Sequence, residues 1–177
     1  AFSRVFDRKT FMGEKLKHVI EPRLMFRTVG GIDNFDNVIL FDETDLLSNT
    51  TEAEVSLTQR LYAKKKDGQV DEVLSWQLWQ RRYFDETFGG ALIPGQRNTL
   101  RTSLDLTAYA FLDVARRYSP LVSALRFSPL PWLGVTWRSD YDSRRSRIAN
   151  NEIMADVRVG EKYLLSLGHN QVRSVPI

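Results

Sequence analysis

The chain has 177 residues, of which 42% are hydrophobic and 27% charged, and this is long enough for one domain with its own core. Its net charge of +3 comes from Lys and Arg interspersed with Asp and Glu, so the basic stripe of a nucleic-acid-binding protein is missing and no nucleic-acid partner is expected. Without cysteine, disulfides and thiolate metal sites are impossible, and no run approaches the roughly 18 apolar residues that a transmembrane helix needs.

The first part of the chain predicts two extended segments and a long connection. Residues Phe2–Phe6 resemble the end of a strand, and Leu16–Thr28 places apolar side chains on one face and Lys, Glu and Arg on the other. Pro22 lies in the middle of this segment, where it predicts a bulge or a locally unpaired position, because proline cannot donate a backbone hydrogen bond. The connection Val29–Ala53 is several times longer than an ordinary hairpin loop, which indicates a functional or disordered segment.

A hairpin is predicted next, from Glu54–Lys64 and Glu72–Phe84. The first arm alternates apolar and polar residues along its length, and Asp67 and Gly68 in the connection are expected to supply the positive backbone angles of a tight turn. The second arm is rich in Trp, Tyr and Phe. These aromatic residues fit an interfacial girdle of a membrane barrel and equally fit cross-strand packing in a soluble sheet.

The stretch Asp85–Arg117 contains an alternating piece, Leu100–Leu112, that period alone predicts to be another strand. If Leu100–Leu112 is instead part of a loop, all the short turns lie at one end of the strands and all the long loops lie at the other end. Outer-membrane barrels have that asymmetry, with short periplasmic turns and long extracellular loops. We therefore predict that the loops 29–53 and 85–117 are extracellular. The short turns are Lys65–Asp71, Ser128–Trp132 and Val159–Lys162, and a third long loop is Asp142–Asn150.

Four more strands are predicted in the rest of the chain, and none of the predicted segments shows a helical period. They are predicted at about Ser119–Ser128, Leu133–Tyr141, Ile148–Val159 and Tyr163–Asn170. The fold class is therefore all-β, with about seven to eight antiparallel up-and-down strands. A tilted strand crosses a bilayer in about 9–11 residues, so these segments are long enough to form part of a transmembrane barrel wall. A soluble antiparallel barrel or sandwich that binds a lipid or glycan shows the same alternation and stays open as an alternative.

Five runs of residues, in order along nearly the whole chain, resemble the LptD family of lipopolysaccharide-assembly proteins. They are Leu16–Arg23 (LKHVIEPR), Phe41–Asp45 (FDETD), Tyr83–Gly90 (YFDETFGG), Pro94–Asn98 (PGQRN) and Trp137–Asp142 (WRSDYD). The resemblance implies a non-enzymatic barrel of the Gram-negative outer membrane that passes lipopolysaccharide into the outer leaflet. It also implies an LptE-like plug lipoprotein inside the barrel and an LptA-like periplasmic bridge that docks on an N-terminal jellyroll domain. The family's barrel has more strands than this chain supplies, so 1–177 is expected to be an interior or C-terminal segment of the barrel domain.

The expected binding residues are basic side chains that face the lumen, Arg23, Arg27 and Arg60. An Arg or Lys on the lipid face near the midplane costs about 2–4 kcal/mol, so in a barrel these side chains must point inward. There they either contact an anionic glycolipid or the plug protein, or form a salt-bridge mesh that braces the wall.

No catalytic, metal or cofactor site is expected. His18 and His169 are far apart and lack partners at ligand spacing, and neither is tied by a motif to a serine such as Ser139. The acidic group in Asp42–Asp45 lacks the spacing and the glycine of a calcium loop, which favours a solvated loop over a divalent-cation site. A barrel enzyme is therefore the weakest of the three functional classes considered.

Overall fold

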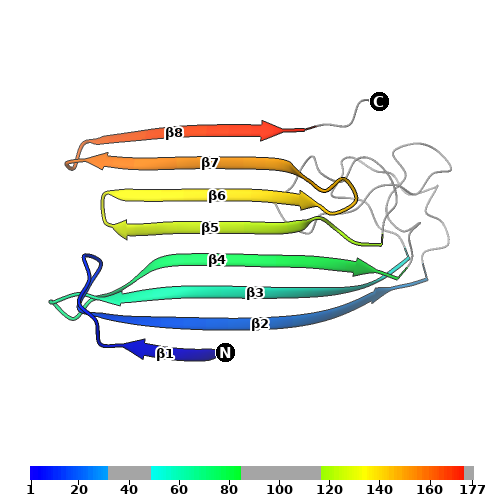
Figure 1. The fold of residues 1–177 in the computed structure, drawn as a ribbon, viewed down its shortest axis with the longest axis horizontal. Coiled ribbons are helices and arrows are strands. Elements are labelled where there is room, and N and C mark those ends of the chain that lie inside the picture. The colour runs from blue at the N-terminus through cyan, green and yellow to red at the C-terminus, as the bar shows by residue number, and fades with distance from the viewer. Residues whose placement is uncertain (32–48, 85–116, 174–177) are drawn as a thin grey trace.

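The computed structural model describes residues 1–31, 49–84 and 117–173, which form one antiparallel sheet (Figure 1). Its eight strands follow one another in the sheet in chain order, each hydrogen-bonded to the next. The predicted all-β, up-and-down architecture is confirmed. The strands are β1 (Phe2–Phe6), β2 (Lys15–Val29), β3 (Thr50–Lys64), β4 (Val70–Tyr83), β5 (Leu121–Leu130), β6 (Leu133–Asp142), β7 (Arg147–Val159) and β8 (Tyr163–Val172).

The connections divide between the two ends of the sheet (Figure 1). The turn end carries the connections β1–β2, β3–β4, β5–β6 and β7–β8, and the loop end carries β2–β3, β4–β5 and β6–β7. Strand β4 pairs directly with β5, with Trp79 opposite Val122. The strands before and after the segment 84–120 are therefore neighbours in the sheet. The segment Leu100–Leu112 lies outside the described residues. Strand β3 begins at Thr50, so the last residues of the predicted loop 29–53 belong to the sheet.

Local backbone geometry refines two of the sequence expectations. In the β3–β4 turn only Gly68 has a positive φ, of 88°, so the prediction for Asp67 is wrong. The Asp67 carboxylate instead accepts a hydrogen bond from the Gln69 backbone N–H at 3.0 Å, which holds the turn without a left-handed residue. The ladder between β2 and β3 runs through Pro22 without a shift, whereas β1 pairs with β2 only as far as Ile20. Pro22 therefore lies beyond the β1 ladder and not at a bulge.

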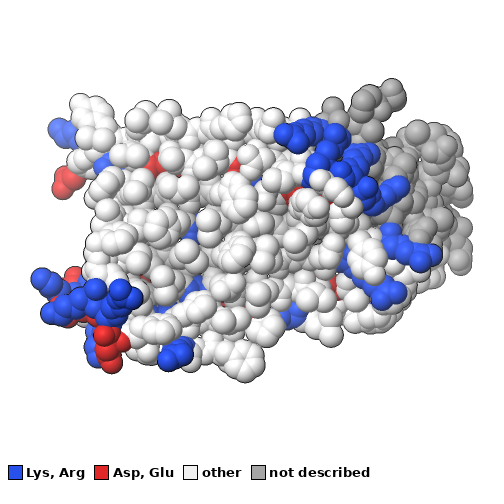
Figure 2. Space-filling view, viewed as in Figure 1, with Lys and Arg blue, Asp and Glu red and all other residues white. Residues whose placement is uncertain are grey.

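Burial on the two faces of the sheet is the reverse of that in a soluble sheet. The outer face, defined by Leu24, Phe26, Val55, Leu165 and Leu167, exposes large apolar side chains, with Leu24 75% and Phe26 65% exposed. Figure 2 shows this face with few charged side chains across its middle and charges gathered at both ends. The inner face carries the charged and polar residues, several of them buried. This face is defined by Glu52, Glu54, Arg81, Asp140 and Asn150.

The sheet is open within the described residues, because β1 and β8 pair only with β2 and β7. An open sheet of this kind fits a partial barrel wall, since full closure requires further strands to cover both edges. Among the residues that the structure describes, no helix is long and apolar enough to cross a membrane.

At the turn end, the β1–β2 connection packs closely against the end of β3 at Gly13. Replacing this glycine by alanine should therefore destabilise the fold. The Glu14 N–H donates to the Lys64 carbonyl at 2.8 Å, and a Cβ on Gly13 would lie 2.6 Å from that same carbonyl oxygen. Because the obstacle is backbone, Gly13→Ala is expected to lower the free energy of unfolding by about 1–3 kcal/mol. Urea unfolding of the full-length protein measures the change. Gly30→Ala is the matched control, because nothing lies within 4 Å of its added Cβ, and an equal loss in both variants would contradict the close-approach argument.

Candidate functional site: the charged inner face

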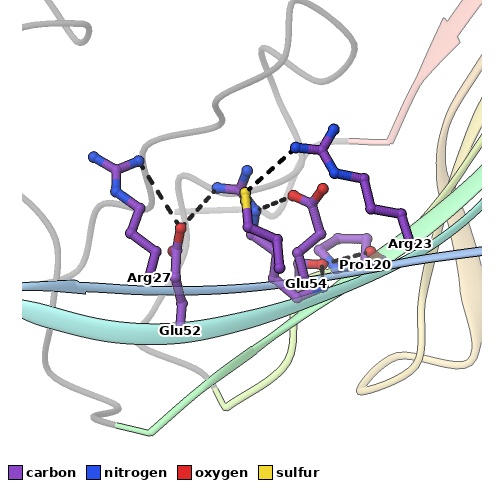
Figure 3. Close-up of polar contacts among 8 residues, drawn as sticks. Arg23, Arg27, Glu52, Glu54 and Pro120 are labelled. Atoms are coloured by element: carbon purple, nitrogen blue, oxygen red, sulfur yellow. Dashed lines mark hydrogen bonds and ion pairs between the residues drawn. The ribbon is translucent and has the colours of Figure 1, made fainter.

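The best-defined polar cluster on the inner face is centred on Arg81. Its Nε lies 2.7 Å from Glu54 Oε2 and its Nη1 lies 3.5 Å from Glu52 Oε1. The Arg81 side chain is only 7% exposed, so these charges interact with little screening by water. On the other side of Glu52, Arg27 Nη1 lies 4.0 Å from the same Oε1 atom. Figure 3 shows these side chains rising from one face of the neighbouring strands.

Strand register is the reason why these charges meet. Glu54 is opposite Arg81 in the β3–β4 ladder, and Arg27 is opposite Glu52 in the β2–β3 ladder. Residues directly opposite on one face of an antiparallel pair have Cβ atoms about 4.5–5.5 Å apart, which suits an ion pair. The Arg81 backbone N–H donates a hydrogen bond to Ser119 Oγ at 2.9 Å, which connects the cluster to the residues just before β5.

Arg60 forms a second and more exposed cluster nearer the turn end. Its Nε lies 3.6 Å from Glu21 Oε2 on β2 and 3.8 Å from Glu72 Oε2 on β4. The guanidinium therefore bridges three strands. Arg60 and Arg27 thus both lie within 4.0 Å of carboxylates on neighbouring strands, the arrangement that a bracing mesh requires.

Arg23 differs from the other two predicted binding residues. Among the described residues it makes no ion pair, and its Nη2 lies 4.0 Å from Met25 Sδ. In Figure 3 its guanidinium stands on the same side of the sheet as that of Arg27. Of the three arginines, Arg23 has the charge most available to a ligand.

A hollow of about 650 Å³ lies at the turn end, bounded by β4 to β8 and their turns. Arg126 and Arg158 line it together with apolar side chains such as Trp132 and Leu164. Neither arginine forms an ion pair within the described part of the chain. The carboxylates of Asp71, Glu72 and Asp156 line the same hollow, so its lining carries both signs of charge beside the apolar side chains.

Buried acids and an amide occupy the inner face between β6 and β7. Asp140 is opposite Asn150 in the ladder, and Asp142 follows two residues later on the same face. All three side chains are buried. Across residues 1–31, 49–84 and 117–173, no group of three or more His, Asp or Glu side chains is arranged to hold a metal ion. The acidic run 42–45 lies outside the described residues.

Sequence reasoning missed Arg81 and Glu52, the most buried members of the Arg81 cluster. Glu52 fell within the predicted loop 29–53, and no local motif marks Arg81. Counting residues outward from the Gly68 turn, with Lys64 opposite Val70, would have placed Glu54 opposite Gln80. The one-residue shift of register between Leu61 and Tyr62 brings Arg81 to that position, and the sequence does not reveal this shift.

Removing Arg81 should destabilise the sheet far more than removing Arg60. Arg81→Gln leaves Glu54 without its partner and Glu52 with only the more distant Arg27, and an unpaired buried charge costs about 3–5 kcal/mol. Arg60→Gln is the matched control, because its side chain is 37% exposed and an exposed pair contributes at most about 1 kcal/mol. Urea unfolding of the full-length protein compares the two variants. Equal losses would show that Arg81 has no special structural role.

Comparison with known proteins identifies the family. No curated protein matches the chain. A family model described as "LptD: LPS transport system D" matches residues 1–177, which is the whole chain. The match agrees with the open all-β sheet and its charged inner face. The chain therefore belongs to the LptD family of lipopolysaccharide transport proteins.

Proposed function

We propose that this chain forms part of the wall of an outer-membrane β-barrel that delivers lipopolysaccharide to the outer leaflet without catalysing a covalent reaction. The observation that carries the proposal is the reversed burial of the two faces. Large apolar side chains such as Leu24, Phe26 and Leu167 are exposed, whereas Glu52, Arg81 and other charged side chains are buried. Family membership supports the transport role.

Free energies favour a membrane over water around the outer face. Removing a Leu or Phe side chain from water is worth about 1.5–3 kcal/mol, and the outer face carries many such residues on strands long enough to cross a bilayer at a tilt. A soluble barrel or sandwich that binds a lipid or glycan would bury this face. The observed burial therefore disfavours the soluble alternative.

The partners follow from the family and from the chemistry of the inner face. An LptE-like plug lipoprotein inside the barrel would lie against this face, and an LptA-like bridge would deliver lipopolysaccharide through an N-terminal domain. Within the wall, we assign Arg27 and Arg60 to bracing, because each stands beside a carboxylate. Of the three predicted residues, we assign Arg23 to contact with the anionic glycolipid or the plug. We assign the same role to Arg126 and Arg158, which line the turn-end hollow.

The orientation that we propose places the turn end in the periplasm and the loop end outside the cell. The connections β3–β4, β5–β6 and β7–β8 at the first end are short, and the two longest connections leave from the second (Figure 1). The predicted long loop Asp142–Asn150 is wrong, because β6 ends at Asp142 and β7 begins at Arg147. Outer-membrane barrels show this asymmetry. The loops 29–53 and 85–117 are therefore proposed to be extracellular.

Site-directed labelling tests the membrane-facing assignment. The chain has no cysteine, so single cysteines in this segment can be labelled without background from it. Fluorophores on Leu57→Cys and Ala155→Cys, both on the outer face, are expected to be quenched by nitroxide lipids in proteoliposomes of the full-length protein. Because adjacent strand residues point to opposite faces, Ser56→Cys and Met154→Cys are matched controls that should escape quenching. Quenching that does not follow this alternation would rule out the barrel wall.

Epitope tagging in intact cells tests the orientation. A tag between Ser143 and Arg144 at the loop end is expected to bind antibody on intact cells, because this turn would be extracellular. A tag between Gly160 and Glu161 at the turn end should bind only after the outer membrane is permeabilised. The reverse pattern would overturn the orientation while leaving the wall assignment in place.

A further inference from the structure

Two basic side chains lie opposite one another on the outer face, towards the turn end. Arg4 of β1 is paired with His18 of β2, and we call these two residues the basic pair. Because alternate residues of a strand share a face, His18 lies on the same face of β2 as Leu24 and Phe26. Figure 2 shows a blue side chain over β1, at the margin of the face whose middle carries few charges. The basic pair therefore belongs to the surface that we assign to the membrane.

Apolar residues lie on both sides of the basic pair along the strands. Phe2 is opposite Ile20 on the side of the loop end, and Phe6 is opposite Leu16 on the side of the turn end. Phe2 is 69% exposed and Phe6 is 40% exposed. The Arg4 guanidinium carbon lies 5.3 Å from the ring centre of Phe6, so the cation stands over an aromatic face. The outer face thus presents two polar groups within an apolar surface.

The acids nearest in sequence to the basic pair have other positions and partners. Lys15 Nζ lies 2.6 Å from Asp7 Oδ1, and Lys9 Nζ lies 3.9 Å from Glu14 Oε1. Glu21, the acid of β2, lies on the inner face. Within residues 1–31, 49–84 and 117–173, neither member of the basic pair forms an ion pair. An anionic group that approaches the outer face can therefore reach both side chains.

The position of His18 along β2 matches one border of a membrane-spanning band. Between His18 and Thr28 the outer-face residues are all apolar, namely Ile20, Pro22, Leu24 and Phe26. At the other border, the hydroxyl oxygens of Thr28 and Thr51 are 3.2 Å apart. The strand from His18 to Thr28 is about 33 Å long, which becomes about 25 Å along the membrane normal at a tilt of about 40°. The apolar band of an outer-membrane barrel is about 25 Å tall. In the proposed orientation, the basic pair therefore lies where the band meets the periplasmic headgroups.

We infer that the basic pair binds the phosphate group of a phospholipid in the periplasmic leaflet of the outer membrane. The inference rests on the proposed membrane orientation and adds a lipid site on the outside of the wall, separate from the charged inner face. A guanidinium group donates two parallel hydrogen bonds to phosphate oxygens, and an imidazole has an N–H to donate in either protonation state. Residues opposite one another have Cβ atoms about 4.5–5.5 Å apart, so both side chains can contact one phosphate. Phe2 and Ile20 then lie beside the first carbons of the acyl chains.

The test uses the full-length protein in detergent and dioleoyl phosphatidylglycerol as the probe. Binding is titrated by native mass spectrometry for the parent and for the double variant Arg4→Gln, His18→Gln. Loss of one cation near an anionic lipid weakens binding about five-fold, and loss of one hydrogen-bond donor weakens it about three-fold. The double variant should therefore bind on the order of ten-fold more weakly. Dioleoylglycerol, which has the same acyl chains and no phosphate, should not distinguish the parent from the variant.

A neighbouring residue on the opposite face controls for net charge. Lys17 precedes His18 in β2, is exposed and points to the inner face. Lys17→Gln and Arg4→Gln each remove one positive charge, and only Arg4→Gln should weaken binding, by about five-fold. Equal losses in these two variants, or unchanged affinity in the double variant, overturns the inference. If the double variant does not fold, Arg4→Gln alone decides, and unchanged affinity in that variant is then the contradicting result.

A second lipid distinguishes the two leaflets. Bisphosphorylated lipid A should bind the double variant as tightly as it binds the parent, because the glycolipid belongs to the other side of the membrane. An equal loss of affinity for both lipids would show a general phosphate site and overturn the assignment to a phospholipid. Reversed orientation in the epitope assay would overturn the assignment to the periplasmic leaflet.

Transport assays in cells separate this inference from the proposed function. Lipopolysaccharide delivery by the double variant should equal that of the parent, because the basic pair lies on the outside of the wall. Weakened phosphatidylglycerol binding with intact delivery supports both proposals. Unchanged binding with intact delivery overturns only the phospholipid site. Absence of delivery by the parent protein refutes the transport function, whatever the binding titration shows.

Discussion

Backbone hydrogen bonding between successive strands is the constraint on which the rest of this structure depends. In an antiparallel ladder a slip of one residue exchanges the two faces of a strand. The β3–β4, β5–β6 and β6–β7 ladders each contain one shift of register, at Leu61/Tyr62, Phe127/Leu130 and Asp140/Tyr141. All three lie near strand ends. The central part of every strand therefore keeps one alternation, and the apolar outer face and charged inner face remain continuous from β1 to β8.

The inner face shows how charges are accommodated in such a wall. Arg81 meets two carboxylates of the adjacent strand, and Arg60 bridges carboxylates of the strands on either side of its own. Each contact joins neighbouring strands and not residues along one strand. The ion pairs thus connect neighbouring strands, as the backbone hydrogen bonds do. They hold the strands together on the inner face, where no apolar core is available because the large apolar side chains point outward.

Period-two alternation made most of the fold predictable, because each strand is two-faced and bounded by turn residues. The eight strands, the antiparallel order and the short turns all follow from that pattern together with residues such as Gly68. Contacts between strands were not predictable to the same degree. The Arg81 cluster depends on register, and the predicted loop 29–53 concealed Glu52, since a Thr- and Glu-containing strand start has no strong hydrophobic signal. The proposed roles of Arg23, Arg27 and Arg60 differ for the same reason. Among the described residues, Arg27 and Arg60 lie beside carboxylates of neighbouring strands and Arg23 does not, and this depends on the ladder.

The arginines at the loop end of the sheet also bear on how the wall is assembled and retained. Among them are Arg82 near the end of β4 and Arg144 and Arg145 in the β6–β7 turn. In the proposed orientation the loop end reaches the outer surface, so these guanidinium groups must cross the hydrocarbon layer as the strands insert. A charged side chain at the bilayer centre is costly, by about 2.5–3.5 kcal/mol for Arg on insertion scales. The same barrier opposes withdrawal after insertion, so the inserted sheet owes part of its persistence to a slow rate of extraction in addition to its equilibrium stability.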